Sequence, residues 1–113
     1  MNSWQITSTM QINKTDMTEN IEKIDDVKVK VTKCFISPKD VSIFSGEYKK
    51  PFPYIPSGIA VGQVVETLKE SDYLKKGSKV FLAPTYEPGY TNGFLRDFAV
   101  LPQTSLKVLP RTV

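Results

Sequence analysis

Apolar and polar residues alternate along several short stretches of the chain, and this is the period expected of β-strands. Residues 4–12 carry apolar side chains mostly at even positions, and residues 27–36 begin by alternating valine with lysine. Lys28 and Lys30 are therefore expected on the solvent-exposed face of a half-buried strand. Similar runs, bounded by turn residues, predict further strands at residues 59–68, 79–83, 93–101 and 106–109.

One short helix is expected directly after the strand at residues 27–36. Ser37 is a residue type that caps helices, Pro38 suits the first helical position, and Asp40 favours the positive end of the helix dipole. Gly46 offers a stop two turns later. Gly62, inside a predicted strand, indicates a bulge or a close approach of two backbones. Short strands with little helix predict a mostly β domain, either a barrel or a sandwich.

Length and charge narrow the class of protein. The chain has 113 residues, which corresponds to one domain, and residues 15–26 are polar enough to form a mobile loop. The net charge is +3, but the lysines are scattered along the sequence, so no nucleic-acid partner is expected. No apolar run approaches the roughly 20 residues of a membrane span, and no signal-peptide pattern opens the chain. A cytoplasmic protein without a membrane partner is expected.

The counts of histidine and cysteine limit the possible chemistry. The chain has no histidine, which is the commonest zinc ligand and the commonest general base. Its single cysteine, Cys34, allows neither an internal disulfide nor a thiolate cage for a metal. A structural, buried or half-buried role is expected for Cys34, because no neighbouring histidine is available to activate its thiol.

Four stretches occur in an order and at a spacing that resemble a known family. They are VKVKVTKCFISPKDVSIFSGEY, PYIPSGIAVGQVVE, LKKGSKVFLAP and GFLRDFAVLP, and together they cover residues 27–110. The set resembles the N-terminal GroES-like catalytic domain of the medium-chain dehydrogenase/reductase family, which includes alcohol dehydrogenases and quinone oxidoreductases. The resemblance implies a GroES-like, partly open β-barrel with one or two short helices over residues 1–113.

The resemblance also bears on metal binding. The zinc-dependent members of this family have a cysteine ligand at the position of Ser37 and a Gly-His-Glu signature at residues 57–59. A serine hydroxyl is a poor zinc ligand, and Gly58 and Ile59 carry no donor atoms in their side chains. The zinc-free quinone oxidoreductases commonly show Asn-Pro-x-Asp at this turn, and SPKD keeps the proline and the aspartate. The chain therefore resembles the zinc-free type, and no metal site is expected.

The same resemblance implies a nicotinamide cofactor. In this family a Rossmann domain with a G-x-G-x-x-G turn follows the GroES-like domain. No two glycines here stand two positions apart, so no cofactor-binding residues are expected in this chain. We expect part of an NAD(P)-dependent oxidoreductase that acts on a small carbonyl, enone or quinone and is inactive without the Rossmann domain. A homo-oligomer is a further possibility, which the sequence alone does not decide. A free-standing β-barrel that binds a ligand or partner without catalysis is the alternative.

Polar and aromatic residues around the expected helix are candidates for the site. Ser37 and Asp40 are candidate catalytic residues, although each also suits a structural role in the first turn of the helix. Lys39 is a candidate contact for a cofactor phosphate, with a solvated side chain as the alternative. Aromatic and proline-rich loops line apolar substrate pockets well, although they also plug barrel ends. The candidate substrate-binding residues are Ser37, Tyr48, Phe52, Tyr54 and Tyr86.

Overall fold

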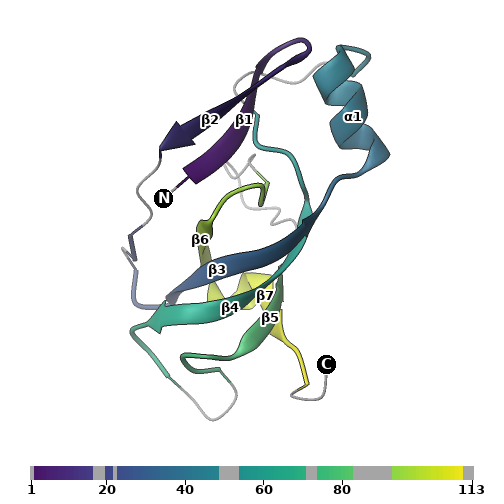
Figure 1. Ribbon diagram of the computed structural model, residues 1–113. Coiled ribbons are helices and arrows are strands. Elements are labelled where there is room, and N and C mark those ends of the chain that lie inside the picture. The colour runs from purple at the N-terminus through teal and green to yellow at the C-terminus, as the bar shows by residue number, and fades with distance from the viewer. Residues whose placement is uncertain are drawn as a thin grey trace.

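A computed structural model of the chain shows a small two-stranded sheet beside a larger, curled five-stranded sheet (Figure 1). It describes residues 2–16, 20–21, 23–48, 54–70, 74–82 and 93–110. Within these residues the fold is mostly β with one α-helix, and the curled sheet confirms the predicted partly open barrel. The strands are β1 (Asn2–Ser8), β2 (Gln11–Asp16), β3 (Asp26–Phe35), β4 (Ile59–Thr67), β5 (Lys79–Leu82), β6 (Phe98–Pro102) and β7 (Leu106–Val108). The helices are α1 (Pro38–Ser45) and the 3-10 helix η1 (Gln103–Ser105).

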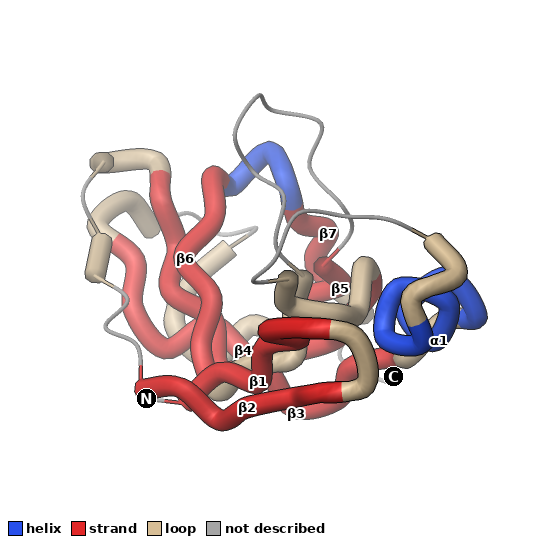
Figure 2. The backbone as a smooth tube through the Cα atoms, turned by 90° about the horizontal axis from the view of Figure 1, so that it is seen from above, coloured by secondary structure: helices blue, strands red, loops and turns tan. Residues whose placement is uncertain are grey.

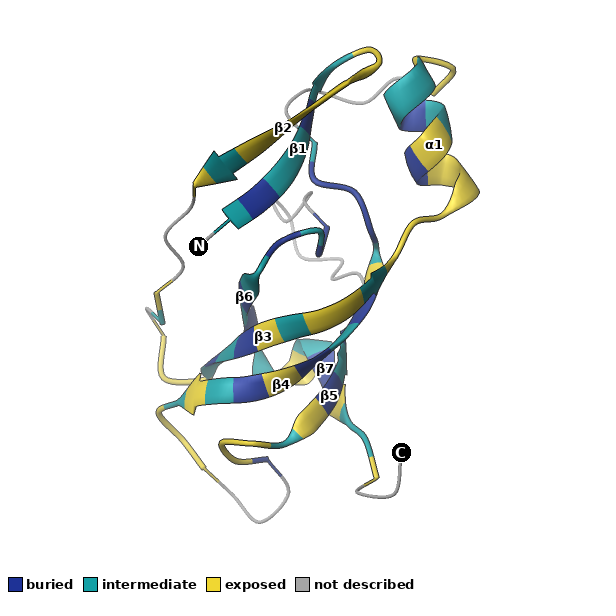
Figure 3. Cartoon of the chain, in the orientation of Figure 1, coloured by how far each residue is buried: buried dark blue, intermediate teal, exposed yellow. Residues whose placement is uncertain are grey.

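The five-stranded sheet is antiparallel throughout, in the order β6-β3-β4-β5-β7. One face of each strand is buried and the other is at least partly exposed, as the alternating colours along β3 and β4 show (Figure 3). This confirms the alternation predicted for residues 27–36. The buried side chains form the core: Val27, Val29, Ala60, Val64, Leu74, Val80, Leu82, Phe94, Ala99, Leu101 and Leu106.

β3 and β4 approach each other closely at Gly62. A Cβ atom at this position would lie 2.5 Å from the carbonyl oxygen of Lys30 and 2.5 Å from Cγ1 of Val29. The register between the two strands shifts between Val31 and Lys33, so that Thr32 is bulged out of the pairing. Both the predicted close approach at Gly62 and a bulge next to it are therefore present.

The prediction of one strand over residues 4–12 is wrong, because the chain reverses at Thr9 and Met10 to form the β1–β2 hairpin. Met10 adopts a φ of +63°, a left-handed conformation that glycine or asparagine usually provides. No such residue stands at this position, so the turn gave no signal in the sequence. β2 also extends to Asp16, into the segment predicted as a mobile loop.

The predicted strand at residues 93–101 is only half correct, because β6 begins at Phe98. Of the preceding residues, Leu95 and Asp97 bond to β1, and Gly93 and Phe94 bond to the loop before β4. The backbone N–H of Gly93 donates to the carbonyl of Ile55 at 2.8 Å, and that of Phe94 donates to the carbonyl of Ser57 at 2.7 Å. These hydrogen bonds join segments that are far apart in the sequence. The local alternation of apolar and polar residues therefore cannot predict them.

Helix α1 lies next to the turn of the β1–β2 hairpin, as the view from above shows (Figure 2). The backbone N–H of Met10 donates to the carbonyl of Phe44 at 2.8 Å and joins the two elements. No helix in the described part of the chain is long and apolar enough to cross a membrane.

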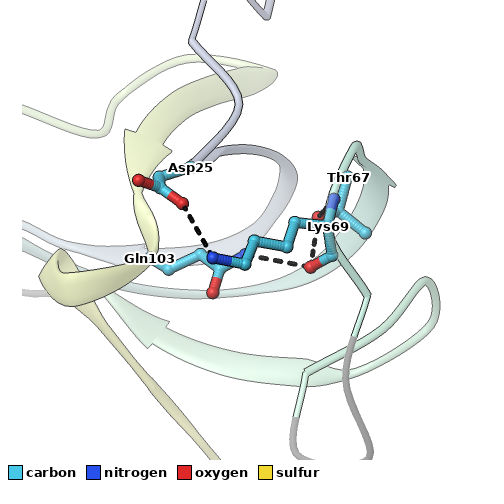
Figure 4. A network of polar contacts seen from close by, with 4 residues as sticks. All are labelled: Asp25, Thr67, Lys69 and Gln103. Atoms are coloured by element: carbon cyan, nitrogen blue, oxygen red, sulfur yellow. Dashed lines mark hydrogen bonds and ion pairs between the residues drawn. The ribbon is translucent and has the colours of Figure 1, made fainter.

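Polar contacts near the end of β4 connect it to η1 and to the start of β3 (Figure 4). Gln103 Nε2 donates to the carbonyl of Lys69 at 3.1 Å, and Lys69 Nζ lies 3.7 Å from Asp25 Oδ1. Because both charged side chains are 67% exposed, this ion pair adds little stability.

Candidate functional site

The candidate site lies where β3 ends and where β4 and α1 begin. Phe35, the last residue of β3, pairs with Ile59, the first residue of β4, and both are exposed. The chain turns at Ser37 into α1, and residues 54–58 pass beside this turn. We call residues 35–40 together with residues 54–59 the helix corner.

The start of α1 is closed by a reciprocal pair of hydrogen bonds between Ser37 and Asp40. Ser37 Oγ accepts from the backbone N–H of Asp40 at 3.2 Å, and Asp40 Oδ2 accepts from the backbone N–H of Ser37 at 3.0 Å. At the other end, Gly46 has a φ of +88° and its N–H donates to the carbonyl of Ile43. The predicted cap, start and stop of the helix are confirmed.

The carboxylate of Asp40 is the polar centre of the helix corner. The residue is only 4% exposed, yet hydrogen-bond donors surround it. Besides the Ser37 N–H, Oδ2 accepts from Ser37 Oγ at 3.2 Å and from the backbone N–H of Ser57 at 3.1 Å. Oδ1 accepts from the hydroxyl of Tyr54 at 3.4 Å. The carboxylate therefore holds the start of α1 and residues 54–57 in one arrangement.

Ser57 connects the helix corner to the sheet, a role that the sequence did not reveal. It is fully buried and has a φ of +75°. Its Oγ accepts from the backbone N–H of Phe35 at 3.1 Å and donates to the carbonyl of Ile59 at 2.9 Å. A serine in a left-handed conformation is uncommon, and these hydrogen bonds offset its cost. The proline-rich loop that contains Ser57 gave no sign in the sequence of these long-range partners.

Tyr54 has a perturbed hydroxyl. Burial, with the Asp40 carboxylate next to it, raises the pKa of Tyr54 from 10.0 to about 12. Both effects disfavour the phenolate, because burial removes water from it and Asp40 repels its negative charge. Tyr54 therefore stays protonated and acts as a hydrogen-bond donor throughout the physiological range.

A spectrophotometric titration tests this arrangement, with the five tyrosines of the chain followed by their phenolate absorbance. We expect one component to ionise at a pH near 12, above the ordinary value of 10. Because the unfolded chain loses this proton first, the contribution of Tyr54 to stability is present below pH 10 and is lost as the pH rises toward 12. The variant Tyr54→Phe should lack the late component; its persistence in that variant would contradict the assignment.

Of two other predicted site residues, Lys39 lies in the first turn of α1 and Tyr48 lies beyond the end of the helix. Lys39 Nζ lies 5.2 Å from the ring centre of Tyr48, and both residues are exposed. This contact gives Lys39 a partner within the chain, and a contact with a cofactor phosphate stays a prediction. Phe52 and Tyr86 lie outside the described residues.

An apolar cavity of about 300 Å³ lies next to the helix corner, between the β1–β2 hairpin and α1. Of the predicted site residues that the structure describes, only Asp40 lines it. The other lining residues are Ile6, Ile12, Ile36, Val41, Phe44, Pro56 and Leu95. The sequence did not reveal these aliphatic walls, because they come from segments that meet only in the folded chain.

The helix corner offers few ligands for a metal. Ser37, Gly58 and Ile59 lie together here, and none of them carries a thiolate, imidazole or carboxylate. Within the described ranges no three or more histidine, cysteine, aspartate or glutamate side chains cluster to hold a metal ion. Cys34 is half-buried and packs against the core, as its predicted structural role requires.

Replacing Ser37 by alanine removes the cap of α1 while leaving the backbone unchanged. We expect the free energy of unfolding to fall by about 1 kcal/mol, the usual effect of losing a serine cap. A urea titration of the two proteins measures this as a lower midpoint with an unchanged slope. An equal midpoint would show that the hydroxyl stabilises nothing and would favour a role toward substrate.

The sequence has clear relatives. Residues 23–111 match the family model of the alcohol dehydrogenase GroES-like domain. The quinone oxidoreductase of Sus scrofa is 33% identical over 100 residues, which are 86% of this chain and 29% of that protein.

Solved structures show the same fold. S. aureus TarJ superposes with a TM-score of 0.78 at 25% identity, over 97% of this chain and 32% of that one. A short chain alcohol dehydrogenase (rspB) from E. coli CFT073, complexed with the cofactor NADH, superposes with a TM-score of 0.83 at 19% identity, over 100% of this chain and 39% of that one. The chain thus spans between 29% and 39% of the length of these proteins. With a family model matched over most of its length, this chain belongs to the alcohol dehydrogenase GroES-like domain family, within the medium-chain dehydrogenase/reductase superfamily.

Proposed function

We propose that this chain is the substrate-side part of a zinc-independent, NAD(P)-dependent oxidoreductase that acts on a small carbonyl, enone or quinone. The relatives support the reaction class. The similar protein of Sus scrofa is a quinone oxidoreductase, and two solved neighbours are complexes with NADPH and NADH. Since the chain spans about a third of these proteins, we propose that a Rossmann domain supplies the cofactor site.

The observation that carries the proposal is the hydrogen-bonding of the helix corner. Its geometry is held by donors that converge on Asp40, from Ser37, Ser57 and Tyr54. Ser37, Gly58 and Ile59, at the positions of the family's zinc signature, supply no strong metal ligand. Protein hydrogen bonds therefore provide the rigidity that a metal and its ligands would otherwise give to this corner.

The helix corner is suited to holding a carbonyl compound. When bound, a nicotinamide cofactor supplies hydride transfer to or from the reacting carbon. The exposed apolar side chains of Phe35, Ile36 and Ile59 would contact the substrate and exclude water. The Ser37 hydroxyl, also exposed, would turn its single proton from Asp40 to the substrate oxygen and orient that oxygen by the new hydrogen bond.

The apolar cavity beside the helix corner favours a second candidate function. A volume of about 300 Å³ is sufficient for a small ligand. A free-standing β-barrel that binds an apolar molecule without catalysis would use this cavity and would need no cofactor.

Assays of the longest product of the gene separate the two functions. We expect oxidation of NADPH or NADH that depends on an added quinone, enone or aldehyde. Activity should survive dialysis against EDTA, and elemental analysis should find much less than one zinc per chain. The matched control is Lys14→Ala, on the exposed strand β2, which should keep full activity.

Two outcomes would contradict the proposal. Activity that is lost with EDTA and restored by zinc would overturn metal independence. If neither NADPH nor NADH is oxidised with any of these acceptor classes, the proposed oxidoreductase activity is overturned and the binding module is favoured.

A further inference from the structure

The apolar cavity between the β1–β2 hairpin and α1 shares a wall with the helix corner. Of the residues that line it, Ile36, Asp40 and Pro56 belong to the corner. The other walls come from β1, β2, α1 and the segment before β6, and both views show α1 beside the hairpin (Figure 1, Figure 2). The cavity is therefore continuous with the place where the substrate oxygen would bind.

The accessible walls of this cavity are apolar. Asp40 also lines it, but the hydrogen bonds described above already occupy both of its carboxylate oxygens. A water molecule needs about two to four polar partners to be held in a cavity. The described walls offer it none, so a hydrocarbon group suits this space better than water does.

The cavity has a closed floor and an open mouth. Ile6, which lines it from β1, is only 2% exposed. Ile12 and Val41, which line it from β2 and α1, are 47% and 56% exposed. Neighbouring exposed apolar side chains of this kind are typical of ligand-binding grooves. A ligand can therefore enter the cavity from solvent without disturbing the core.

Ser37 lies at the boundary between the cavity and the exposed part of the helix corner. Ile36 precedes it in the chain, and its Oγ lies 3.2 Å from Oδ2 of Asp40. A carbonyl compound whose oxygen is bound by the Ser37 hydroxyl can therefore extend a hydrocarbon chain into the cavity. Apolar cavities of about 150 Å³ take up benzene. The volume of about 300 Å³ is therefore sufficient for a chain of several carbons.

We propose that this cavity holds the hydrocarbon side chain of the carbonyl substrate and selects for it. The inference rests on the oxidoreductase function proposed above, and it narrows the substrate class to enones, quinones or aldehydes that carry an uncharged chain of several carbons. A short homologue would leave the apolar walls in contact with water. A chain that ends in a carboxylate would bury a charge against walls that offer it no hydrogen bond. Both should bind more weakly.

An NMR titration of the chain with three ketones tests the subsite. It contains no cofactor, so its outcome is independent of the activity assay. We expect 2-heptanone to give saturable shifts at the methyl groups of Ile12 and Val41 and at the backbone amide of Ser37. Its affinity should exceed that of 2-butanone about tenfold, because more methylenes are buried. 6-Oxoheptanoate, which ends the same chain in a carboxylate, should also bind about tenfold more weakly than 2-heptanone.

The same substitution at two exposed isoleucines separates the cavity from general surface binding. Ile12→Trp places a larger side chain in the cavity and should weaken the binding of 2-heptanone about tenfold. The matched control is Ile24→Trp, at an exposed isoleucine outside the cavity, which should stay within about twofold of the wild type. Val41→Thr keeps the volume of the wall but adds a hydroxyl, so we expect a loss of about threefold.

Several outcomes of the titration would overturn the subsite. These are equal affinities for the three ketones, or equal effects of the two tryptophan substitutions in variants that thermal unfolding shows to be folded. Methyl shifts without a shift at Ser37 would overturn it too, because one molecule would then not occupy both places. Shifts of Ile12 and Val41 that depend on protein concentration without any ketone would show that a second copy of the chain covers these walls, which also contradicts the proposal.

The same preference should appear in catalysis by the longest product of the gene. We expect kcat/KM for 1-octen-3-one to exceed that for 1-penten-3-one about tenfold, and Ile12→Trp to remove most of this difference. Ile24→Trp should keep it. Oxidation of NADPH or NADH without a preference for the longer chain would overturn the subsite and leave the proposed oxidoreductase function intact.

Discussion

Gly93→Ala is expected to lower the free energy of unfolding by at least about 3 kcal/mol, the largest of the predicted effects. A Cβ at this position would lie 2.3 Å from the carbonyl oxygen of Ser57 and 2.4 Å from that of Pro56. Both oxygens are backbone atoms that accept hydrogen bonds from Phe94 and Leu95, so neither can move without breaking a bond. The methyl group therefore forces apart the segments that support the helix corner.

A thermal or urea unfolding experiment measures this effect, and Gly77→Ala is the matched control. Gly77 has a φ of +94°, but a Cβ there would meet no atom within 4 Å. Its substitution should cost only about 1 kcal/mol, from backbone strain alone. Similar unfolding midpoints for the two variants would show that the close contacts at Gly93 do not determine the loss of stability. Loss of cooperative unfolding in Gly93→Ala alone would agree with the prediction.

Asp40→Ala is expected to lower the free energy of unfolding by about 3–4 kcal/mol, the second largest effect. The substitution leaves the buried N–H of Ser57 without its partner, and it also removes the acceptor for Ser37 and Tyr54. An unsatisfied buried donor costs about 1–3 kcal/mol, and loss of the helix-cap bond adds to this.

The conservative variant Asp40→Asn separates hydrogen bonding from packing. Its amide oxygen can still accept from Ser57 or Ser37, so we expect roughly half the loss of Asp40→Ala. Urea titrations of both variants and of Ser37→Ala provide the comparison. If Asp40→Ala lowers the free energy of unfolding no more than Ser37→Ala does, the hydrogen bonds from Ser57 and Tyr54 add no stability. The carboxylate of Asp40 would then not be the centre of the helix corner.

Elements with strong local signals were predictable from the sequence. The alternation of valine and lysine located β3, and Ser37, Pro38 and Gly46 located both ends of α1. Here local propensity and the tertiary fold agree. The close approach at Gly62 was also predictable, because glycine weakens a strand interior and usually stands there only where a side chain would not fit.

Features that depend on distant partners were not predictable. The turn at Met10 carries no turn residue, and its conformation is stabilised by a bond to Phe44 on α1. Residues 93–97 are not part of β6 because they bond mainly to residues 55–57 and to β1. Ser57 organises the helix corner through contacts that only the folded backbone creates. The structure brings the predicted residues Ser37 and Asp40 into contact, their bonds to Ser57 and Tyr54 were not foreseen, and a role of these residues toward substrate stays a prediction.

The position of β1 has a consequence for the order of folding during synthesis. The backbone N–H of Asn2 donates to the carboxylate of Asp97, 95 positions away, and the N–H of Trp4 donates to the carbonyl of Leu95. At ribosomal rates of about 5–20 residues per second, the first strand waits roughly 5–20 seconds for these partners. Contacts between residues this far apart in the sequence also slow folding. The nascent chain therefore keeps β1 incomplete until residues 95–97 have left the ribosome.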